Sequence, residues 1–429
     1  MKFKIYLLLF VTALLTAIAF GIHIVYPLVF GLLIFSLDAF LKGFSFKEWL
    51  SMLKDGAKTV KNLILIFTLI GFLTASWRLS GTIQYLVYNG ANLINPKLFY
   101  LYAFVLTLIM SMLIGSINGT ITTMGIVIIS LARANAASLL ITSGAILSGG
   151  IFGDRISPVS SSAYLVAELT ETDVIENRKI MFRSIIVPTI ISGLIFLLLS
   201  IFKGGSSIDT KLLSELSQST KLSVYSLVPA LLIVFLALAK FSTKSLLIIS
   251  SLASVIIAYF VQGFGIKEII EGLIFGVNIP NLSPNLSTIV NSGGLQSMFL
   301  TIICVLLSAM YYGIFKKTDF LKPVKNIIEN LEKKIGTYWT FVTISFLFSI
   351  LFGTQAIVVM LITSLYKDKI PDKKELMLDL ENGPIIIPSL IPWNMAAFLA
   401  FSIYQVPFRA VVFNVFAIIT VIYYKKFKK

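Results

Sequence analysis

The stretch SGGIFGDRISPVSSSAY, residues 148–164, lies inside a long hydrophobic segment but has the composition of a broken helix. Its three glycines and Pro158 disfavour a continuous helix. Asp154 and Arg155 stand side by side in it, and a cluster of serines follows. In hydrocarbon, unwound backbone and ionisable groups are tolerated only where protein or a water-filled cavity surrounds them. The stretch therefore predicts a cation or solute site inside a membrane. The alternative is a structural kink in which Asp154 pairs with a neighbour.

The composition of the whole chain indicates a polytopic membrane protein. Of its 429 residues 57% are hydrophobic and 13% are charged, and no water-soluble fold needs so much apolar surface. The net charge of +15 is typical of lysine-rich cytoplasmic loops, so no nucleic-acid partner is needed to explain it. The single Cys304 and single His23 exclude a disulfide, a thiolate metal site and a multi-histidine centre. We expect the lipid bilayer as a partner and no cofactor.

Apolar segments of about 20 residues predict the membrane crossings. We expect an all-α polytopic membrane protein with about ten transmembrane helices, two re-entrant hairpins and broken helices. In the first half the expected spans are 3–21, 25–40, 63–77 and 185–202, with a surface piece at 46–62 and a hairpin at 99–131. A polar linker at 203–221 leads to spans at 222–238, 246–262 and 296–315, with a surface piece at 263–276 and a loop at 278–291. A broken apolar pair around Gly353, a second broken helix from Glu381 and a last span ending at Tyr424 complete the chain.

The two halves, 1–202 and 203–429, resemble each other in the same order along the chain. The segment GFSFKE at 43–48 matches GFGIKE at 263–268, and Gly115-Ser116 is echoed by Gly353-Thr354. Aligning Pro158 with Pro392 pairs Gly149 with Gly383 and Ser160 with Asn394. Together these matches favour an internal duplication.

The distribution of basic residues predicts the topology. With five crossings and one hairpin in each half and the N-terminus inside, most of the 35 Lys and Arg residues fall in cytoplasmic loops. An odd number of crossings per half inverts the second repeat, and the site then lies where the broken helices meet. We expect a multi-pass plasma-membrane protein with both termini in the cytoplasm.

Several motifs resemble those of one transporter family. GGIFGDRISPVSSSA, at 149–163, is similar to the GDKxSPLSDTT signature of NhaC-type sodium/proton antiporters, and IPSLIPWN, at 387–394, is similar to their SPLIPWN stretch. GSINGTITTMG, at 115–125, resembles their hairpin motif GTSWGTxGTxG, and GGLQSM, at 293–298, also fits. The resemblance covers most of the chain. It implies a sodium/proton exchanger of the ion-transporter group with an elevator-like motion; some relatives move malate and lactate or amino acids.

The chain departs from that family pattern at two acidic positions. Where the family shows Asp-Thr-Thr, this chain has Ser161-Ser162-Ala163, and where relatives show Gly-Asp-Gln it has Gly353-Thr354-Gln355. Asp154 is therefore the only acid left in the motif. Hard cations prefer oxygen ligands, so one carboxylate with hydroxyls and carbonyls still predicts a sodium site.

Two transport functions follow. In the first, Asp154 binds sodium and proton alternately, with Ser157 and Ser161 as further sodium ligands. In the second, sodium or a proton is a coupling ion and an amino acid or small organic anion is carried, with Arg155 and backbone amides at 118–122 and 393–395 attracting its negative group. The candidate ion- and substrate-binding residues are Ser116, Asn118, Thr120, Thr122, Thr123, Gly153, Asp154, Arg155, Ser157, Ser160, Ser161, Ser162, Thr354, Gln355, Trp393 and Asn394.

Other interpretations of these residues stay open. Trp393 could equally be a packing residue and not part of the substrate site. The hydroxyls of Thr122 and Thr123 could equally bond to carbonyls of their own helix. We expect Asp379 and Glu381 to lie in a cytoplasmic loop. A channel would need a symmetric pore or a ring of charge. A membrane aspartyl protease would need a second acid, and a serine hydrolase would need a base near its serine. We expect a carrier and not an enzyme; a homodimer is left open.

Overall fold

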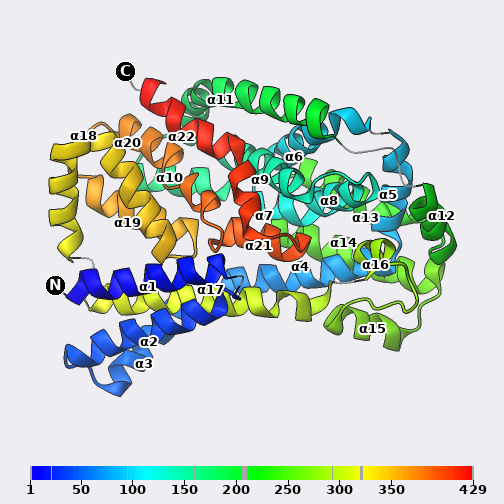
Figure 1. The fold of residues 1–429 in the computed structure, drawn as a ribbon, viewed down its shortest axis with the longest axis horizontal. Coiled ribbons are helices and arrows are strands. Elements are labelled where there is room, and N and C mark those ends of the chain that lie inside the picture. Colours follow the sequence, from blue (N-terminus) through cyan, green and yellow to red (C-terminus); the bar gives the residue numbers. More distant parts are fainter. Residues whose placement is uncertain are drawn as a thin grey trace.

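The computed structural model describes residues 2–20, 22–93, 95–157, 160–204, 210–291, 293–318 and 322–427. Pro158, on which the expected helix break partly depended, lies outside these ranges. Eight helices within them are long and apolar enough to cross a membrane, or nine if one bent pair forms a single span. The protein is therefore an all-α polytopic membrane protein, as predicted. Figure 1 shows both chain ends toward the same end of the molecule, at the left of the view.

The first half contains eleven α-helices among the described residues. They are α1 (Lys2–Ala19), α2 (Val25–Leu41), α3 (Phe46–Lys58), α4 (Lys61–Leu79), α5 (Thr82–Leu93), α6 (Phe99–Ile114), α7 (Ile117–Thr120), α8 (Ile126–Ala134), α9 (Leu139–Ile156), α10 (Ser161–Thr170) and α11 (Val174–Lys203).

The second half contains eleven more within the same described part of the chain. They are α12 (Thr210–Ser219), α13 (Val228–Leu238), α14 (Thr243–Ile257), α15 (Ile266–Phe275), α16 (Pro284–Val290), α17 (Gly294–Lys317), α18 (Lys322–Leu351), α19 (Gln355–Tyr366), α20 (Lys373–Asn382), α21 (Met395–Tyr404) and α22 (Val415–Phe427). α18 merges two helices at Gly336, whose φ of 78° is a conformation that glycine adopts without steric cost.

The segment from α6 to α8 folds as the predicted hairpin. α6 ends at Gly115 in a left-handed turn, and the chain then returns through α7, a π-helical stretch (Ile121–Gly125) and α8. The backbone N–H of Ser138, just beyond α8, donates to the hydroxyl of Tyr100 at the start of α6 at 2.8 Å. The hairpin therefore begins and ends at the same level.

The glycine-rich part of α9 corrects one expectation. Gly149, Gly150 and Gly153 were expected to interrupt the helix, but α9 runs through all three and ends only after Ile156. These glycines instead allow close packing against α6: a Cβ at Gly153 would lie 2.1 Å from the carbonyl carbon of Ser111. Small residues spaced four apart are a common way for membrane helices to bring their backbones together.

A common offset of 234 residues relates the two broken helices. α20 begins at Lys373, 234 residues after α9 begins at Leu139. α10 (161–170) and α21 (395–404) share this offset at both ends, and each is followed by a residue in the left-handed conformation, Glu171 and Gln405. In the second half the helix breaks earlier than in the first, because α20 ends at Asn382 and an irregular stretch leads to α21.

The packing of other elements is reciprocal between the halves. The amphipathic α3 packs on α17, and α15, its sequence counterpart, packs on α4. At the start of each, a glutamate three residues on accepts a hydrogen bond from the backbone N–H, at 2.8 Å in Ser45–Glu48 and 2.7 Å in Gly265–Glu268. α4 and α17 also contact each other, as do α2 and α17, and α4 and α14.

Besides α20, most of which lies in an expected loop, three helices occupy segments that were not expected to be helical. The polar linker at 203–221 contains α12, and the axes of α12 and the helix that follows it differ by 102°. α16 lies in the expected loop at 278–291, and α5 fills a segment without an assignment. These short helices pack on one another and on α8, so tertiary contacts support sequences too polar or short to be recognised alone.

An exposed ionic cluster joins the loops that follow α10 and α19. Glu171 accepts from Lys367 at 3.0 Å and from Lys373 at 2.7 Å. These two ammonium groups lower the pKa of Glu171 from 4.5 to about 2. A lowered pKa means that the pair contributes stability above pH 4.5 and loses it progressively as the pH falls toward 2.

Replacing Glu171 by Gln is therefore expected to lower the melting temperature slightly at pH 7, because exposed ion pairs contribute little. The difference from the wild type should shrink as the pH falls from 4.5 toward 2, and also at high salt. Melting curves in detergent at several pH values measure it. Glu168→Gln is the control, because Glu168 is an exposed acid in α10, the helix that Glu171 follows. A difference that stays constant with pH would show that the pair does not stabilise the loops.

Candidate functional site

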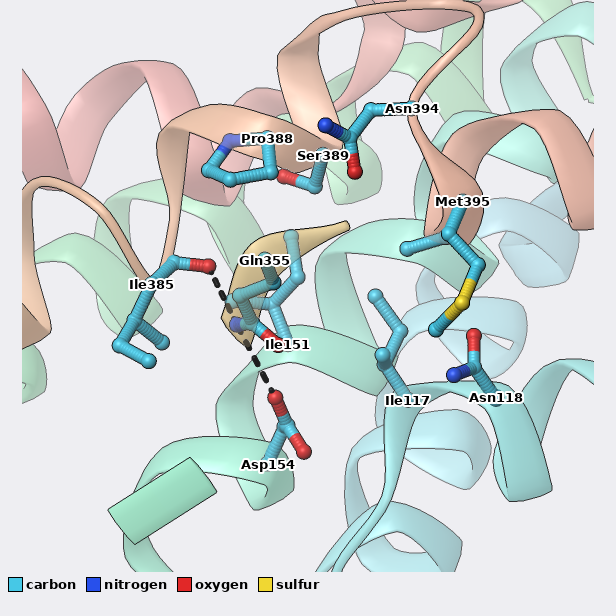
Figure 2. A pocket seen from close by; sticks show the side chains of 11 residues that line it. Ile117, Asn118, Ile151, Asp154, Gln355, Ile385, Pro388, Ser389, Asn394 and Met395 are labelled. Atoms are coloured by element: carbon cyan, nitrogen blue, oxygen red, sulfur yellow. Dashed lines mark hydrogen bonds between the residues drawn. The ribbon is translucent and has the colours of Figure 1, made fainter. Parts of the chain in front are cut away.

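A small cavity lies where elements of the two halves meet in the centre of the protein. It is lined by Ile117, Asn118, Ile151, Asp154, Gln355, Ile385, Pro388, Ser389, Asn394, Met395 and Ala396. These residues come from α7, α9, the start of α19, and the stretch from the irregular segment after α20 into α21. Figure 2 shows the Asp154 carboxylate below the cavity and Ser389 and Asn394 above it.

Asp154 carries the carboxylate of this cavity, and only 5% of the residue is exposed. It lies in the last turn of α9, where the α6 hairpin and α19 approach. Its Oδ2 is 3.4 Å from the amide nitrogen of Gln355, and the backbone N–H of Ile117 lies close enough to interact with the carboxylate. The contacts hold the carboxylate in place but leave it facing the cavity (Figure 2).

Asn118 contributes an oxygen without a partner. Its Oδ1 is buried and accepts no hydrogen bond from any residue that the structure describes. Asn118 is the second residue of α7, whose preceding residue, Ser116, accepts from the N–H of Gly119 at 3.4 Å. A buried oxygen beside a cavity is costly unless something fills the cavity and binds it.

The second half supplies a fixed wall opposite Asp154. The amide nitrogen of Gln355 donates to the carbonyl of Ile385 at 2.7 Å as well as to Asp154, so it links the two broken regions. The amide nitrogen of Asn394 donates to the carbonyls of Ser349 and Phe352 at 3.2 and 2.8 Å, which leaves its oxygen for other partners. Thr354, the N-cap residue of α19, is buried but makes no capping hydrogen bond.

The serine cluster does not line the cavity. Ser160 and Ser162 donate to the backbone carbonyl of Asp154, the latter at 2.6 Å, and Ser162 also reaches the carboxylate. Ser157 donates to the carbonyl of Met112 at 2.7 Å, and Ser161 is exposed. The hydroxyls thus compensate for the helix break, whereas Ser389 of the second half, not expected from sequence, reaches the cavity.

The threonines of the hairpin bond to their own helix. Thr120 donates to the carbonyl of Ser116, and Thr122 and Thr123 both donate to that of Gly119, at 3.1 and 2.7 Å. Trp393 donates from its indole N–H to the carbonyl of Ile350 at 3.0 Å and is buried outside the cavity lining. The hydroxyls of Thr122 and Thr123 thus bond to their own helix and Trp393 packs outside the cavity, and Thr120, a candidate ligand, also bonds to its own helix.

Arg155 and Glu381 form a buried ionic pair that the sequence did not predict. Glu381 was expected in a cytoplasmic loop with Asp379, but both are buried, because α20 packs against α10, α11, α19 and α22. The Nε of Arg155 lies 3.7 Å from the Oε2 of Glu381, and its Nη2 donates to the Oδ1 of Asn382 at 2.9 Å. Arg155 therefore turns away from its neighbour Asp154 and toward α20. The nearby Asp379 accepts from the hydroxyl of Tyr424 at 2.9 Å.

A model of the Na⁺/H⁺ antiporter family matches residues 1–167 and 151–427, which together cover nearly the whole chain. The chain belongs to the Na⁺/H⁺ antiporter family. This family member is similar to the Na⁺/H⁺ antiporter NhaC of Bacillus subtilis, with 26% identity over 92% of this chain and 90% of the relative. It is also similar to the malate-2H⁺/Na⁺-lactate antiporter of Bacillus subtilis, with 26% identity over 82% of this chain and 77% of the relative.

A further relative of this antiporter-family chain is the arginine/ornithine antiporter ArcD of Halobacterium salinarum, with 24% identity over 68% of this chain and 62% of the relative. The relatives are membrane antiporters, and the chain is accordingly a transporter and not an enzyme. Their names differ in the cargo. Membership in the Na⁺/H⁺ antiporter family therefore does not by itself identify the transported solute, and the cavity has to distinguish between the candidates.

Proposed function

We propose that the protein exchanges sodium for protons across the plasma membrane, with Asp154 binding the two cations alternately. The observation that carries this proposal is a buried carboxylate that faces an ion-sized cavity, with an unpaired amide oxygen from Asn118 on the cavity wall. Sodium and a proton then compete for the same group, which is the requirement for exchange. The family and the NhaC relatives support the same cargo.

The size of the cavity supports a bare ion over an organic solute. Its volume is about 20 Å³, measured as the space open to the centre of a water molecule. On that measure one water needs about 10–15 Å³. Lactate, malate or an amino acid would not fit without a rearrangement of the walls. Sodium would find oxygen ligands on Asp154, Asn118, Asn394 and Ser389, and hard cations prefer such ligands.

The arrangement of the elements supports transport by alternating access. Residues 1–202 and 203–429 are the two units of an inverted repeat in this proposal, and the common offset and the reciprocal packing of α3 and α15 support it. The cavity is lined by both units, so a movement of one against the other would open it to alternate sides. Both termini lie in the cytoplasm in this arrangement, because most lysine-rich segments then do so as well.

Transport into proteoliposomes tests the proposal. An imposed sodium gradient should drive proton movement without any added solute, and a proton gradient should drive ²²Na⁺ movement. The same vesicles are then supplied with malate, lactate, arginine and ornithine. Proton flux that requires one of these solutes would contradict simple exchange and favour a coupled carrier of an organic solute.

Asn118→Ala should weaken sodium binding while the protein stays folded. Loss of one oxygen ligand to a charged group costs about 1.5–3 kcal/mol, so the KM for sodium should rise about 10-fold or more. The initial rate of sodium-driven proton flux at several sodium concentrations measures it. Asn135→Ala is the matched control, because Asn135 is also buried with an unpaired Oδ1 but does not line the cavity. An unchanged KM in Asn118→Ala would remove Asn118 from the site.

A further inference from the structure

The pair formed by Arg155 and Glu381 is buried but incompletely bonded. The two residues are 0% and 1% exposed. Their closest atoms, Nε and Oε2, are 3.7 Å apart, which is too long for a hydrogen bond. Nε and Nη1 of Arg155 and Oε2 of Glu381 have no hydrogen-bond partner among the described residues. A purely structural ion pair in a dry interior normally makes all the hydrogen bonds that its atoms can make. The unbonded atoms of this pair are those expected of charged groups that exchange partners.

Charge counting links this pair to the cavity. Asp154 and Glu381 both interact electrostatically with Arg155 and with each other. One guanidinium balances one carboxylate, so the three groups together need one more positive charge in a medium of low dielectric constant. Sodium in the cavity at Asp154 supplies that charge. When sodium leaves, a proton on either carboxylate supplies it.

The other titratable groups near α20 do not supply the missing charge. Asp379 on the same helix accepts from Tyr424 of α22, and Tyr338 of α18 and Tyr366 of α19 interact with Asp379. On the two remaining helices packed against α20, α10 carries the exposed Glu168, and α11 carries Glu176, paired with Lys374, and the half-buried Arg178. Glu381 thus faces Arg155 and Asp154 as its charged neighbours within the described residues.

The position of Glu381 along its helix relates it to an exposed ionic cluster. Glu381 follows Lys373, the first residue of α20, by eight residues, or about 12 Å of helix. Lys373 belongs to the exposed ionic cluster at the loop after α19. At the other end of this route, Glu381 interacts electrostatically with Asp154, which lines the cavity.

We infer that Glu381 is a second proton-binding residue, which relays the proton between the aqueous side at the Lys373 loop and Asp154. The inference rests on the proposed sodium/proton exchange. With sodium bound at Asp154, Glu381 is ionised and paired with Arg155. When sodium leaves Asp154 toward one side of the membrane, Asp154 takes a proton from water on that side. When the cavity faces the Lys373 loop, the proton passes from Asp154 to the Glu381 carboxylate and then to water on the loop side, and sodium binds Asp154 again. One proton replaces one sodium ion, so the cluster keeps a constant charge, and Arg155 is a positioning residue that pairs with whichever carboxylate is ionised.

Glu381→Gln tests the relay, because glutamine keeps the shape but cannot carry the proton. Sodium-driven proton flux should fall at least 10-fold and lose its dependence on pH, whereas ²²Na⁺ counterflow under equal pH on both sides should continue. The double variant Glu381→Gln/Arg155→Gln removes both members of the pair. It should also lose proton flux and keep sodium counterflow, even if the single variant is poorly folded. Asp379→Asn, a buried acid bonded to Tyr424, should keep both fluxes.

The outcomes separate this inference from the exchange itself. Wild-type vesicles without sodium-driven proton flux would contradict the proposed function. Wild-type flux together with an unaltered rate and pH profile in Glu381→Gln would overturn the relay alone. Loss of sodium counterflow in the folded double variant would also overturn it, because Glu381 would then act on sodium binding and not on proton delivery.

Discussion

Asp154→Asn is expected to reduce sodium-driven proton flux to the level of empty vesicles. The substitution keeps the size of the side chain but removes the carboxylate that faces the cavity, so neither sodium nor a proton has a negative group to bind. Asparagine can still accept from Gln355, so the helix should remain folded. The direct measurement is flux in proteoliposomes, and the second is the thermal stabilisation of the protein by sodium, which should vanish.

Asp38→Asn is the matched control for this substitution. Asp38 is also a buried acid in an apolar helix, α2, but it pairs with Lys42 at 2.8 Å and lies outside the cavity lining. Its replacement should leave the KM for sodium unchanged. Sodium-driven proton flux that persists in Asp154→Asn would mean that another group binds the ion and would remove the proposed site.

Gly153→Ala should have the largest effect on folding. The added methyl group would lie 2.1 Å from the carbonyl carbon and 2.3 Å from the carbonyl oxygen of Ser111, both on the backbone of α6. A flexible side chain can move aside, but two packed helices must separate, and overpacking costs about 1–3 kcal/mol or more. We expect a lower melting temperature and a smaller yield of monodisperse protein in detergent.

Gly193→Ala separates this packing effect from helix propensity. Gly193 is also a helical glycine, in α11, but the nearest atom to an added Cβ would be a ring carbon of Phe104 at 3.9 Å. Alanine is the better helix former by about 1 kcal/mol, so this variant should be at least as stable as the wild type. If both variants melted at the same temperature, the contact between α6 and α9 would not limit stability.

Much of the fold follows from features that a sequence displays directly. Long apolar runs with few charges predict helices such as α4, α11 and α17, because burying their backbone in lipid requires internal hydrogen bonds. The alignment of Pro158 with Pro392 also gave the offset that relates α10 to α21. Helices such as α12 and α16 were missed because their composition is that of a loop, and only contacts with other segments stabilise them.

The site was less predictable, because which residues line the cavity depends on where each side chain points. Asp154 stands out as an acid in an apolar segment, and Asn118, Gln355 and Asn394 were also among the candidates. The serines that follow Asp154 point to its carbonyl and not to the cavity, which spacing alone does not reveal across a helix break. Glu381 was assigned to a loop because lysines precede it, whereas its burial depends on helices far away in the sequence.

The backbone contact between α6 and α9 has a mechanical consequence. Gly149 and Gly153 place no side chain of α9 against α6, and at Gly153 backbone meets backbone, so this contact has few rotamers that could slide or repack. Any displacement during a transport cycle must therefore carry α6 and α9, and Asp154 with them, as a single rigid piece. The shearing surface has to lie elsewhere, where side chains and not main chains meet.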